Sequence, residues 1–257
     1  MPEPWTQPPP RREPDFDNLL KVLARKRPTR PTLFEFFLNL PLYERLSGVR
    51  LEPGVVEREV QMRAVLKSFW RAGYDYATIH ASTFGFPVAS RPHAQTASMN
   101  EGFVITDWDS FERYPWQSPA DFDYDILERL RPEMPDGLKL IVPGPGGVLE
   151  NLVSLVGYDN VCYLLVDNPK LLRAVTDAIG SRLLEHYRIV LGYDTVGAII
   201  GNDDWGFKTQ PMLPPDTMRQ YILPWHKRIA QTAHDAGRPV ILHSCGNLSL
   251  LMDDVID

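Results

Sequence analysis

Apolar positions along this chain follow two alternating patterns. Apolar side chains return every three or four positions, as in amphipathic helices, within residues 16–23, 56–70, 122–130, 148–192 and 215–236. Short continuous apolar runs, typical of buried strands, lie between these stretches at residues 32–37, 76–80, 138–142, 196–200 and 239–243. Strands joined by long helices favour a parallel sheet with helical crossovers.

Two α/β architectures fit this alternation, a doubly wound sheet and an eightfold barrel. A doubly wound dinucleotide fold needs a glycine-rich turn after its first strand, and residues 36–40 contain no glycine. We therefore favour a TIM (β/α)8 barrel, of which about five strands can be counted. The chain ends in an apolar periodic stretch, residues 250–257, without a capping glycine or proline. We expect the barrel to be incomplete as given, truncated at its C-terminal end.

Composition along the chain predicts two parts. The first fourteen residues contain six prolines and few apolar side chains, so residues 1–14 are expected to form a disordered proline-rich leader. Residues 15–257 are expected to form the barrel domain. Within it, residues 81–119 are rich in Pro, Ser, Thr and aromatic residues. They predict an irregular insertion, with one short strand at residues 103–105, that covers a binding site or contributes to it.

Charge and cysteine content narrow the classes of function. The net charge is −6 and the isoelectric point about 5.5, with Lys and Arg scattered among acids, so no basic surface for nucleic acid is expected. No apolar run reaches the roughly 18 residues of a membrane helix, and the N-terminus lacks the basic and apolar regions of a signal peptide. Two cysteines cannot form a disulfide framework, and Cys162 lies in an apolar helical stretch where a core thiol is expected. These features predict a cytoplasmic protein that acts on a small molecule, without nucleic-acid or membrane partners.

The most specific chemical pattern is His243-Ser244-Cys245-Gly246, at the end of the last apolar run. Residues two apart on a strand point to the same side, so the imidazole and the thiol project together, and Gly246 permits a sharp turn behind them. An imidazole beside a thiolate is half of a zinc site, and a catalytic zinc takes a third protein ligand and leaves one position open. The alternative is a strand end in which a core cysteine packs against a hydrogen-bonded histidine.

Other polar and aromatic residues near strand ends are candidates for catalysis or substrate binding. Asp203 and Asp204 follow the fourth apolar run, and either carboxylate is a candidate catalytic acid or base, metal ligand or ligand-orienting group. Solvated loop acids are the alternative. The candidate substrate-binding residues are Glu35 in the first apolar run, His80 at the end of the second, and the aromatic Trp205 and Phe207. Here the alternatives are a paired surface acid, a structural histidine and ordinary aromatic packing.

Two further patterns are less specific. Gly144-Pro145-Gly146-Gly147 precedes a helix, and predicts either an anion site formed by free backbone amides or an ordinary turn. His226 and His234 lie eight positions apart on the helix predicted for residues 215–236. We expect both histidines on the surface of that helix or between helices.

Three stretches carry a family resemblance, namely residues 201–207 (GNDDWGF), 221–225 (YILPW) and 237–247 (GRPVILHSCGN), with support from residues 143–147 (PGPGG). They resemble the uroporphyrinogen decarboxylase (URO-D) superfamily, and more narrowly its branch of zinc-dependent corrinoid and coenzyme M methyltransferases and related O-demethylases. The resemblance covers roughly residues 15–257. It implies an eightfold barrel with its active site at the carboxyl ends of the strands and zinc bound by His243 and Cys245. It also implies a further cysteine ligand well downstream, in a region that this chain lacks.

The activity implied by the resemblance is zinc-dependent methyl transfer between a methylated substrate, a corrinoid and/or a thiol. Cobalamin is the implied methyl carrier, as a cofactor or on a partner corrinoid protein, and Asp203 or Asp204 would orient a ligand or move a proton. One alternative is uroporphyrinogen decarboxylase itself, a metal-free lyase whose N-terminal arginine cluster has no match after the first apolar run here. A second alternative is a non-catalytic barrel that binds a small molecule.

Overall fold

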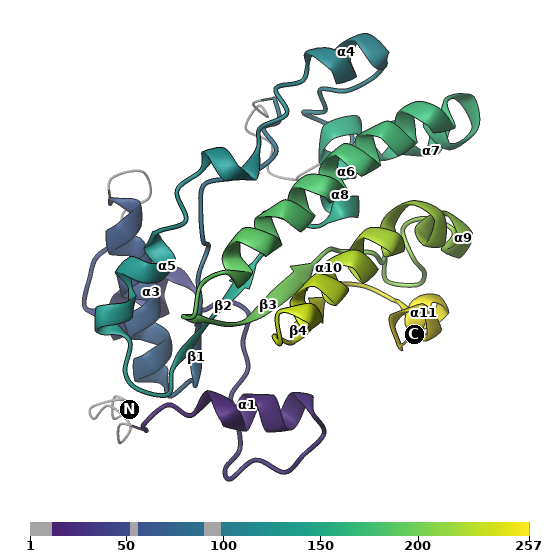
Figure 1. The fold of residues 1–257 in the computed structure, drawn as a ribbon. Coiled ribbons are helices and arrows are strands. Elements are labelled where there is room, and N and C mark those ends of the chain that lie inside the picture. The colour runs from purple at the N-terminus through teal and green to yellow at the C-terminus, as the bar shows by residue number, and fades with distance from the viewer. Residues whose placement is uncertain (1–11, 52–55, 90–98, 257) are drawn as a thin grey trace, which may run out of the picture. The chain divides into compact units, whose positions relative to one another are not determined.

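The computed structural model describes residues 12–51, 56–89 and 99–256 (Figure 1). Most of the leader expected at residues 1–14 lies outside these ranges, so its disorder stays a prediction. The chain divides into two compact units. Unit 1 comprises Met1–Ser82, Asp123–Pro143 and Val190–Ile199, and unit 2 comprises Thr83–Phe122, Gly144–Ile189 and Ile200–Asp257.

Unit 1 contains the first helices and strands of the fold. Its elements are α1 (Phe16–Leu23), α2 (Leu40–Ser47), α3 (Arg58–Ala72), β1 (Tyr76–Thr78), α5 (Ile126–Arg129), a 3-10 turn at Arg131–Glu133, β2 (Lys139–Pro143) and the beginning of β3 (Val196–Asn202). The helix expected at residues 122–130 is therefore confined to the single turn of α5. Helix α3 ends where the sequence indicates, because Gly73 adopts a left-handed conformation (φ +90°) that a glycine takes without strain.

The strands form one sheet in chain order, β1-β2-β3-β4, with β4 at Val240–His243. β1 and β2 are parallel, with Tyr76 opposite Lys139 and Thr78 opposite Ile141. Every residue of β1 is buried, as are the last four residues of β2 and the first six of β3. This explains why these strands appear in the sequence as continuous apolar runs rather than alternating ones.

The first of the five expected strands, at residues 32–37, is wrong: the segment is irregular, bends at Phe36 and belongs to no strand. A single tyrosine takes the place of a neighbouring strand, since Glu35 N donates to Tyr76 Oη (2.7 Å) and Tyr76 Oη donates to Glu35 O (2.7 Å). The apolar side chains of Leu33, Phe34 and Phe37 are more than 40% exposed. An apolar run indicates burial in a sheet only where a partner strand is available. Here the backbone of the run forms hydrogen bonds with the Tyr76 side chain instead.

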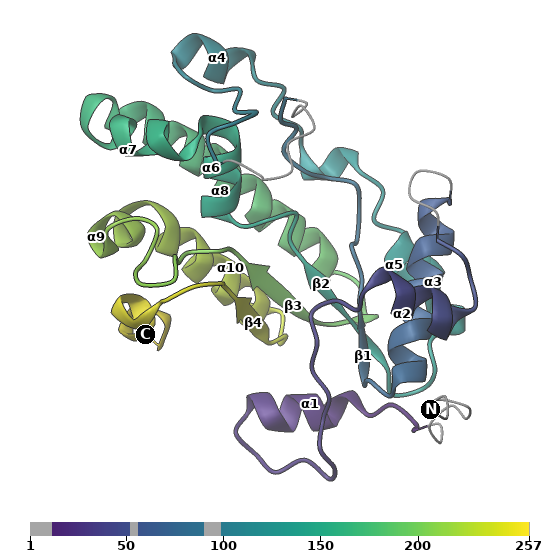
Figure 2. The same ribbon diagram turned by 180° about the vertical axis from the view of Figure 1, so that it is seen from behind.

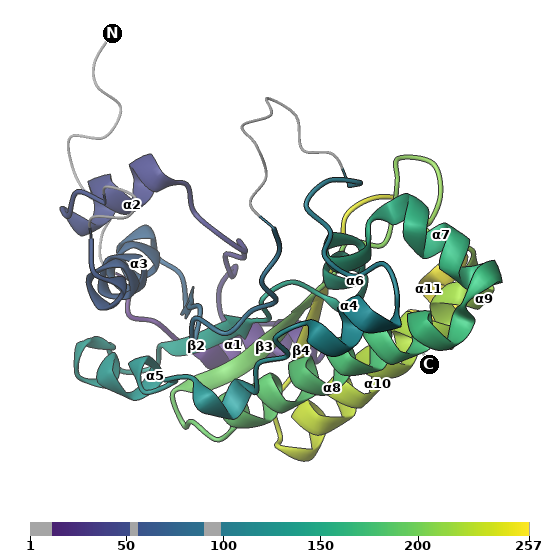
Figure 3. The ribbon, with the colours of Figure 1, turned by 90° about the horizontal axis from the view of Figure 1, so that it is seen from above.

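Unit 2 is mainly helical. It contains α4 (Trp108–Arg113), a 3-10 turn at Pro119–Asp121, α6 (Val148–Val156), α7 (Tyr158–Asp167), α8 (Pro169–Leu191, which ends just inside unit 1), α9 (Pro215–Thr217), a π-helix at Met218–Ile222, α10 (Leu223–Asp235), a 3-10 turn at Ser249–Leu251 and α11 (Met252–Ile256). The expected breaks near Gly157 and Pro169 are confirmed, since α6 ends at Gly157 (φ +86°) and α8 begins at Pro169. The end of β3 and the whole of β4 lie next to each other in this unit (Figure 3).

Helices α8 and α10 run side by side (Figures 1 and 2). Their close approach depends on Gly180, because a Cβ at this position would lie 2.1 Å from the Trp225 ring. Trp225 Nε1 donates to Asp177 Oδ1 at 3.2 Å, which fixes the indole on α8. This packing sets the position of the first turn of α10, where His226 lies.

Two further expectations for unit 2 are wrong. Residues 103–105 do not form a strand; instead Val104 N and Ile105 N both donate to Leu155 O, at 2.8 and 2.9 Å, and so complete the last turn of α6. Cys162 is exposed rather than buried, because α7 turns only Val161 fully inward. Within the described ranges, no helix has both the length and the apolar character that crossing a membrane requires.

Candidate metal centre

The loops that follow β3 and β4 are held side by side in unit 2. The hydrogen bonds between them are Asp203 N to His243 O (3.0 Å), Trp205 N to Ser244 Oγ (3.0 Å), Gly206 N to Cys245 O (3.1 Å) and Asn247 N to Phe207 O (2.8 Å). These hydrogen bonds join residues 203–207 to residues 243–247 beyond the end of β3. The side chains of both loops therefore have fixed positions relative to one another.

Two glycines allow the loops to approach this closely. A Cβ on Gly246 would lie 2.0 Å from Gly206 O, and Gly246 has φ +85°, a conformation that other residues adopt only with strain. A Cβ on Gly206 would lie 2.6 Å from Asn247 N. The turn that the sequence predicts at Gly246 is confirmed, and its requirement for glycine is both conformational and steric.

Asp204, His243 and Cys245 come together on these two loops. One potential ligand atom of each, a carboxylate oxygen, a ring nitrogen and Sγ, lies within 4.8 Å of the other two. Cys245 Sγ is 3.8 Å from His243 Nε2, and Cys245 N donates to Asp204 Oδ1 at 2.8 Å. The expected pairing of His243 with Cys245 is therefore present, and one of the two candidate aspartates joins it. Cys245 is exposed and Asp204 is half-buried.

The three side chains fit a zinc ion by donor type and spacing. Zinc binds thiolate sulfur at about 2.3 Å and imidazole nitrogen at about 2.1 Å, so two such ligands at a tetrahedral angle lie about 3.6 Å apart. The observed distance of 3.8 Å between Cys245 Sγ and His243 Nε2 is close to that value. A nitrogen, a sulfur and a carboxylate oxygen form a three-ligand set that leaves the solvent side open.

The Asp204 carboxylate also disfavours ionisation of the neighbouring thiol. Its hydrogen bond with the Cys245 side chain, followed by partial burial and the negative charges of Asp204 and Glu150, raises the pKa of Cys245. Without a cation, the site therefore favours a neutral thiol. A divalent ion at this position would reverse that preference, because it stabilises the thiolate that binds it.

Asp203 points away from this cluster and is completely buried. Its carboxylate accepts hydrogen bonds from Leu149 N (3.0 Å) and Glu150 N (2.9 Å), in the first turn of α6. His226 Nε2 lies 2.8 Å from Asp203 Oδ2. Asp203 therefore supplies the cap that α6 lacks at Gly147, and it links this helix to α10.

The glycine-rich segment before α6 makes room for the Asp203 carboxylate at the N-terminus of this helix. A Cβ on Gly147 would lie 2.1 Å from Asp203 Cγ, so only glycine leaves room for the carboxylate. Gly147 N donates to Glu150 Oε2 (2.9 Å), and Gly144 N donates to Asn202 Oδ1 (3.0 Å). The anion that the helix N-terminus binds is thus a side chain of the protein itself. Burial, followed by the negative charge of Asp203, raises the pKa of Glu150.

His226 is the residue at this site that the sequence does not reveal. The sequence predicts a position on the helix surface or between helices, and in the structure its side chain is only 13% exposed and contacts Asp203. The Trp205 ring meets it edge to face, with 4.9 Å between the centroids. In the structure, one local feature draws attention to this region. A π-helix at Met218–Ile222 directly precedes α10, and π-helical segments are frequent at functional sites. Nothing in the sequence pattern marks that segment.

The two aromatic candidates occupy different environments. Trp205 is 1% exposed, and its Nε1 has no hydrogen-bond partner within the part of the chain that the structure describes. Phe207 is half-buried and packs edge to face on Tyr158, with 5.6 Å between the ring centroids. Substrate binding by either residue stays a prediction.

Glu35 and His80 belong to unit 1, whereas the residues of the candidate metal centre belong to unit 2. The His80 ring stacks on Phe37 at 5.5 Å between centroids, and Arg58 donates to His80 O. Burial by its surroundings, followed by the charge of Arg58, lowers the pKa of His80 and favours the neutral imidazole. A substrate contact by Glu35 or His80 stays a prediction.

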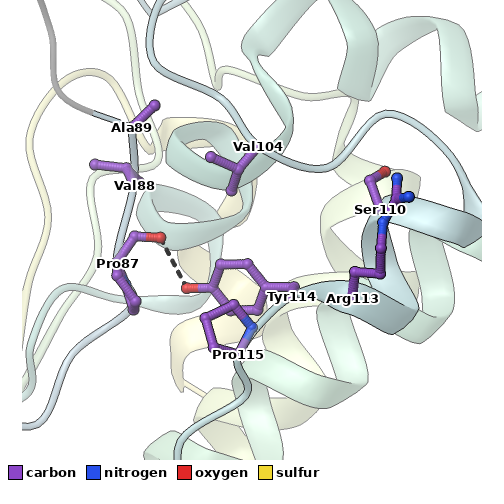
Figure 4. A pocket seen from close by; sticks show the side chains of 8 residues that line it. All are labelled: Pro87, Val88, Ala89, Val104, Ser110, Arg113, Tyr114 and Pro115. Atoms are coloured by element: carbon purple, nitrogen blue, oxygen red, sulfur yellow. Dashed lines mark hydrogen bonds between the residues drawn. The ribbon is translucent and has the colours of Figure 1, made fainter.

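A hollow of about 370 Å³ lies elsewhere in unit 2, within the insertion that the sequence predicts (Figure 4). Its lining residues are Pro87, Val88, Ala89, Val104, Ser110, Arg113, Tyr114 and Pro115. Tyr114 Oη donates to Pro87 O at 3.0 Å across one side of it, and burial raises the pKa of Tyr114 to about 12. None of the candidate catalytic, substrate-binding or metal-ligating residues lines this hollow.

The fold and the site define a class of protein. Helices alternate with strands that form a sheet in chain order, and the polar cluster lies at the carboxyl ends of β3 and β4, where α/β barrel enzymes place their chemistry. The model of the family "Uroporphyrinogen decarboxylase (URO-D)" matches residues 73–257, and the chain belongs to this family of enzymes. The fold class is therefore that of the TIM barrel, of which the described residues contain four strands.

A solved structure of similar fold is that of a methyltransferase from Methanosarcina mazei. The match covers 93% of this chain and 72% of the methyltransferase chain, with a TM-score of 0.65 and 14% sequence identity. At this identity the likeness is one of fold. No curated protein sequence matches the chain.

Proposed function

We propose that this chain is a zinc-dependent methyltransferase that moves a methyl group between a methylated substrate, a corrinoid and/or a thiol. The observation that carries the proposal is the meeting of Asp204, His243 and Cys245 within 4.8 Å at the carboxyl ends of two adjacent strands. This donor set, with one side open to solvent, is of the kind that catalytic zinc sites use. The similarity in fold to a methyltransferase adds support.

The residues of the centre have separate tasks in this proposal. His243 would hold the ion through Nε2 and Cys245 through Sγ, and Asp204 would supply the third ligand atom. Asp204 also accepts the Cys245 N–H, so it fixes the loop that carries the thiol. When bound, zinc supplies a positive charge that lowers the pKa of a substrate thiol or polarises a methoxy oxygen.

The surroundings of the centre determine how substrate and protons reach it. Cys245 is exposed, so a substrate can approach from the solvent side, and a proton released by a substrate thiol passes to water. Of the two candidate catalytic aspartates, Asp204 is the one that a substrate or ion can reach. Asp203 is buried with both oxygens bound by protein groups, and it fits a positioning role.

Metal analysis of the purified chain, combined with a methyl-transfer assay, tests the proposal. We expect zinc to copurify, and methylcobalamin to lose its methyl group to an added thiol such as coenzyme M. Cys245→Ala and His243→Ala should abolish both zinc retention and transfer. Cys162→Ala and His234→Ala, at exposed positions on α7 and α10, are the matched controls and should change neither. Zinc content and activity that survive in Cys245→Ala would overturn the proposal.

The alternative is the decarboxylation from which the family takes its name. A decarboxylase of this family would need no metal, so its activity would persist after chelation. Porphyrinogen turnover by zinc-free protein, with no methyl transfer, would favour this reading. A chain that binds substrate analogues but performs neither reaction would instead be a binding barrel.

A further inference from the structure

The two adjacent aspartates of the site are linked through the backbone but serve different partners. Asp204 Oδ1 accepts Cys245 N, whereas the Asp203 carboxylate faces the first turn of α6 and His226 on α10. Since Asp203 is fully buried and contacts three donors, its position determines where the next residue begins. A displacement of Asp203 would therefore move Asp204 relative to His243 and Cys245.

His226 is held firmly enough to fix Asp203. It follows Trp225, whose ring packs on Gly180 and whose Nε1 donates to Asp177, so the first turn of α10 is fixed against α8. The edge-to-face contact with Trp205 holds the imidazole from a second side. Trp205 is itself the residue after Asp204, so His226 contacts both neighbours of this proposed ligand.

We propose that His226 is a positioning residue for the metal centre, acting through Asp203 and Trp205 on the placement of Asp204. This inference rests on the proposed function, because it assumes that Asp204 binds the ion. Groups that orient metal ligands commonly contribute about 10-fold to 100-fold in metal affinity. Asp203 N also donates to His243 O, so the route through Asp204 is the one that a test must separate from a route through the His243 loop.

A thermodynamic cycle with Co²⁺ as the probe tests this inference on the full chain. Co²⁺ affinity and the absorption spectrum of the Co²⁺ form are measured for wild type, His226→Ala, Asp204→Ala and the double variant. We expect His226→Ala to weaken Co²⁺ binding about 10-fold in the wild-type background. In the Asp204→Ala background the same change should have little further effect, because the ligand that it positions is absent. The spectrum of His226→Ala should shift toward that of Asp204→Ala.

His226→Gln and His234→Ala complete the set. Glutamine can place an N–H donor near the position of Nε2, so His226→Gln should recover most of the affinity, and His234→Ala should match wild type. A 10-fold loss that persists in the Asp204→Ala background would show that His226 does not act through Asp204, and would overturn the inference, as would unchanged affinity in His226→Ala. Wild-type chain that binds no Co²⁺ would contradict the metal centre itself, and the inference with it.

Discussion

Asp203 and Asp204 are neighbours in sequence, yet the structure places them in opposite environments. Asp203 is 0% exposed and binds two backbone amides and an imidazole, whereas Asp204 is half-buried and faces an exposed thiol and a histidine. The first carboxylate belongs to the framework of unit 2, and the second belongs to the candidate metal centre. Under the proposed function, one aspartate therefore stabilises the fold around the site and its neighbour binds the ion.

This division follows from the period of an extended chain. Successive side chains point to opposite faces, so one aspartate must turn toward α6 and α10 if the other turns toward the β4 loop. A buried carboxylate is costly unless donors surround it, and the N-terminal turn of α6 supplies such donors. A metal ligand instead needs an open side, which the loops after β3 and β4 provide.

The largest expected difference between the two aspartates is in stability. Asp203→Ala should lower the free energy of unfolding by about 3–5 kcal/mol, because it leaves buried donors on α6 and α10 without an acceptor. Asp204→Ala, in metal-free protein, should lower it by less than about 1 kcal/mol. Urea unfolding of both variants measures the contrast. Equal losses of unfolding free energy in the two variants would contradict the assignment of Asp203, but not Asp204, to the structural framework.

An intermediate effect is expected at Gly147, which makes room for Asp203. Alanine there would bring a Cβ to 2.1 Å from the Asp203 carboxyl carbon, and the displacement should lower stability by about 1–3 kcal/mol. Gly85→Ala is the matched control, since a Cβ at that position meets no atom within 4 Å. A Gly147→Ala variant as stable as the control would mean that Asp203 does not need its observed position.

The smallest expected effect is a pH dependence at Glu150, whose carboxyl group is influenced by the negative charges of both aspartates. Because burial and Asp203 raise the folded-state pKa of Glu150, the folded chain holds this proton more tightly than the unfolded chain does. The Glu150 contribution is thus most favourable below the unfolded-state pKa, and it declines as pH rises through the raised folded pKa. Glu150→Gln should therefore gain stability relative to wild type as pH rises above the ordinary carboxyl pKa of about 4.3.

Urea midpoints for wild type and Glu150→Gln, compared at each pH, measure this effect. Glu128→Gln should show the opposite trend, because Arg131 lowers the pKa of Glu128 and its contribution to stability grows as pH rises. A difference between wild type and Glu150→Gln that does not vary with pH would contradict the assigned environment of Glu150.

The sequence predicts the pairing of His243 with Cys245 better than the framework around it. The pairing of His243 with Cys245 follows from the two-residue period of a strand and needs only local information. The roles of Asp203 and His226 depend on contacts 23 residues apart in the chain, between a strand end and a helix. No local period indicates such a contact. From the sequence alone, His226 therefore cannot be distinguished from an ordinary helix histidine.

The errors in fold prediction have a similar origin. Residues 32–37 have the apolar character of a strand, but Tyr76 supplies the hydrogen bonds that a partner strand would supply. Cys162 lies in an apolar stretch, but the helix rotation leaves it exposed. In both cases the composition is that of a buried element, and the outcome depends on which neighbours the tertiary structure provides.

The zinc content of the purified full chain, measured with that of Cys245→Ala and Cys162→Ala, tests the central claim most directly. The account predicts one zinc per chain in wild type and in Cys162→Ala, and none in Cys245→Ala. Zinc that is absent from wild type after growth and purification with added zinc, or retained in Cys245→Ala, would contradict it.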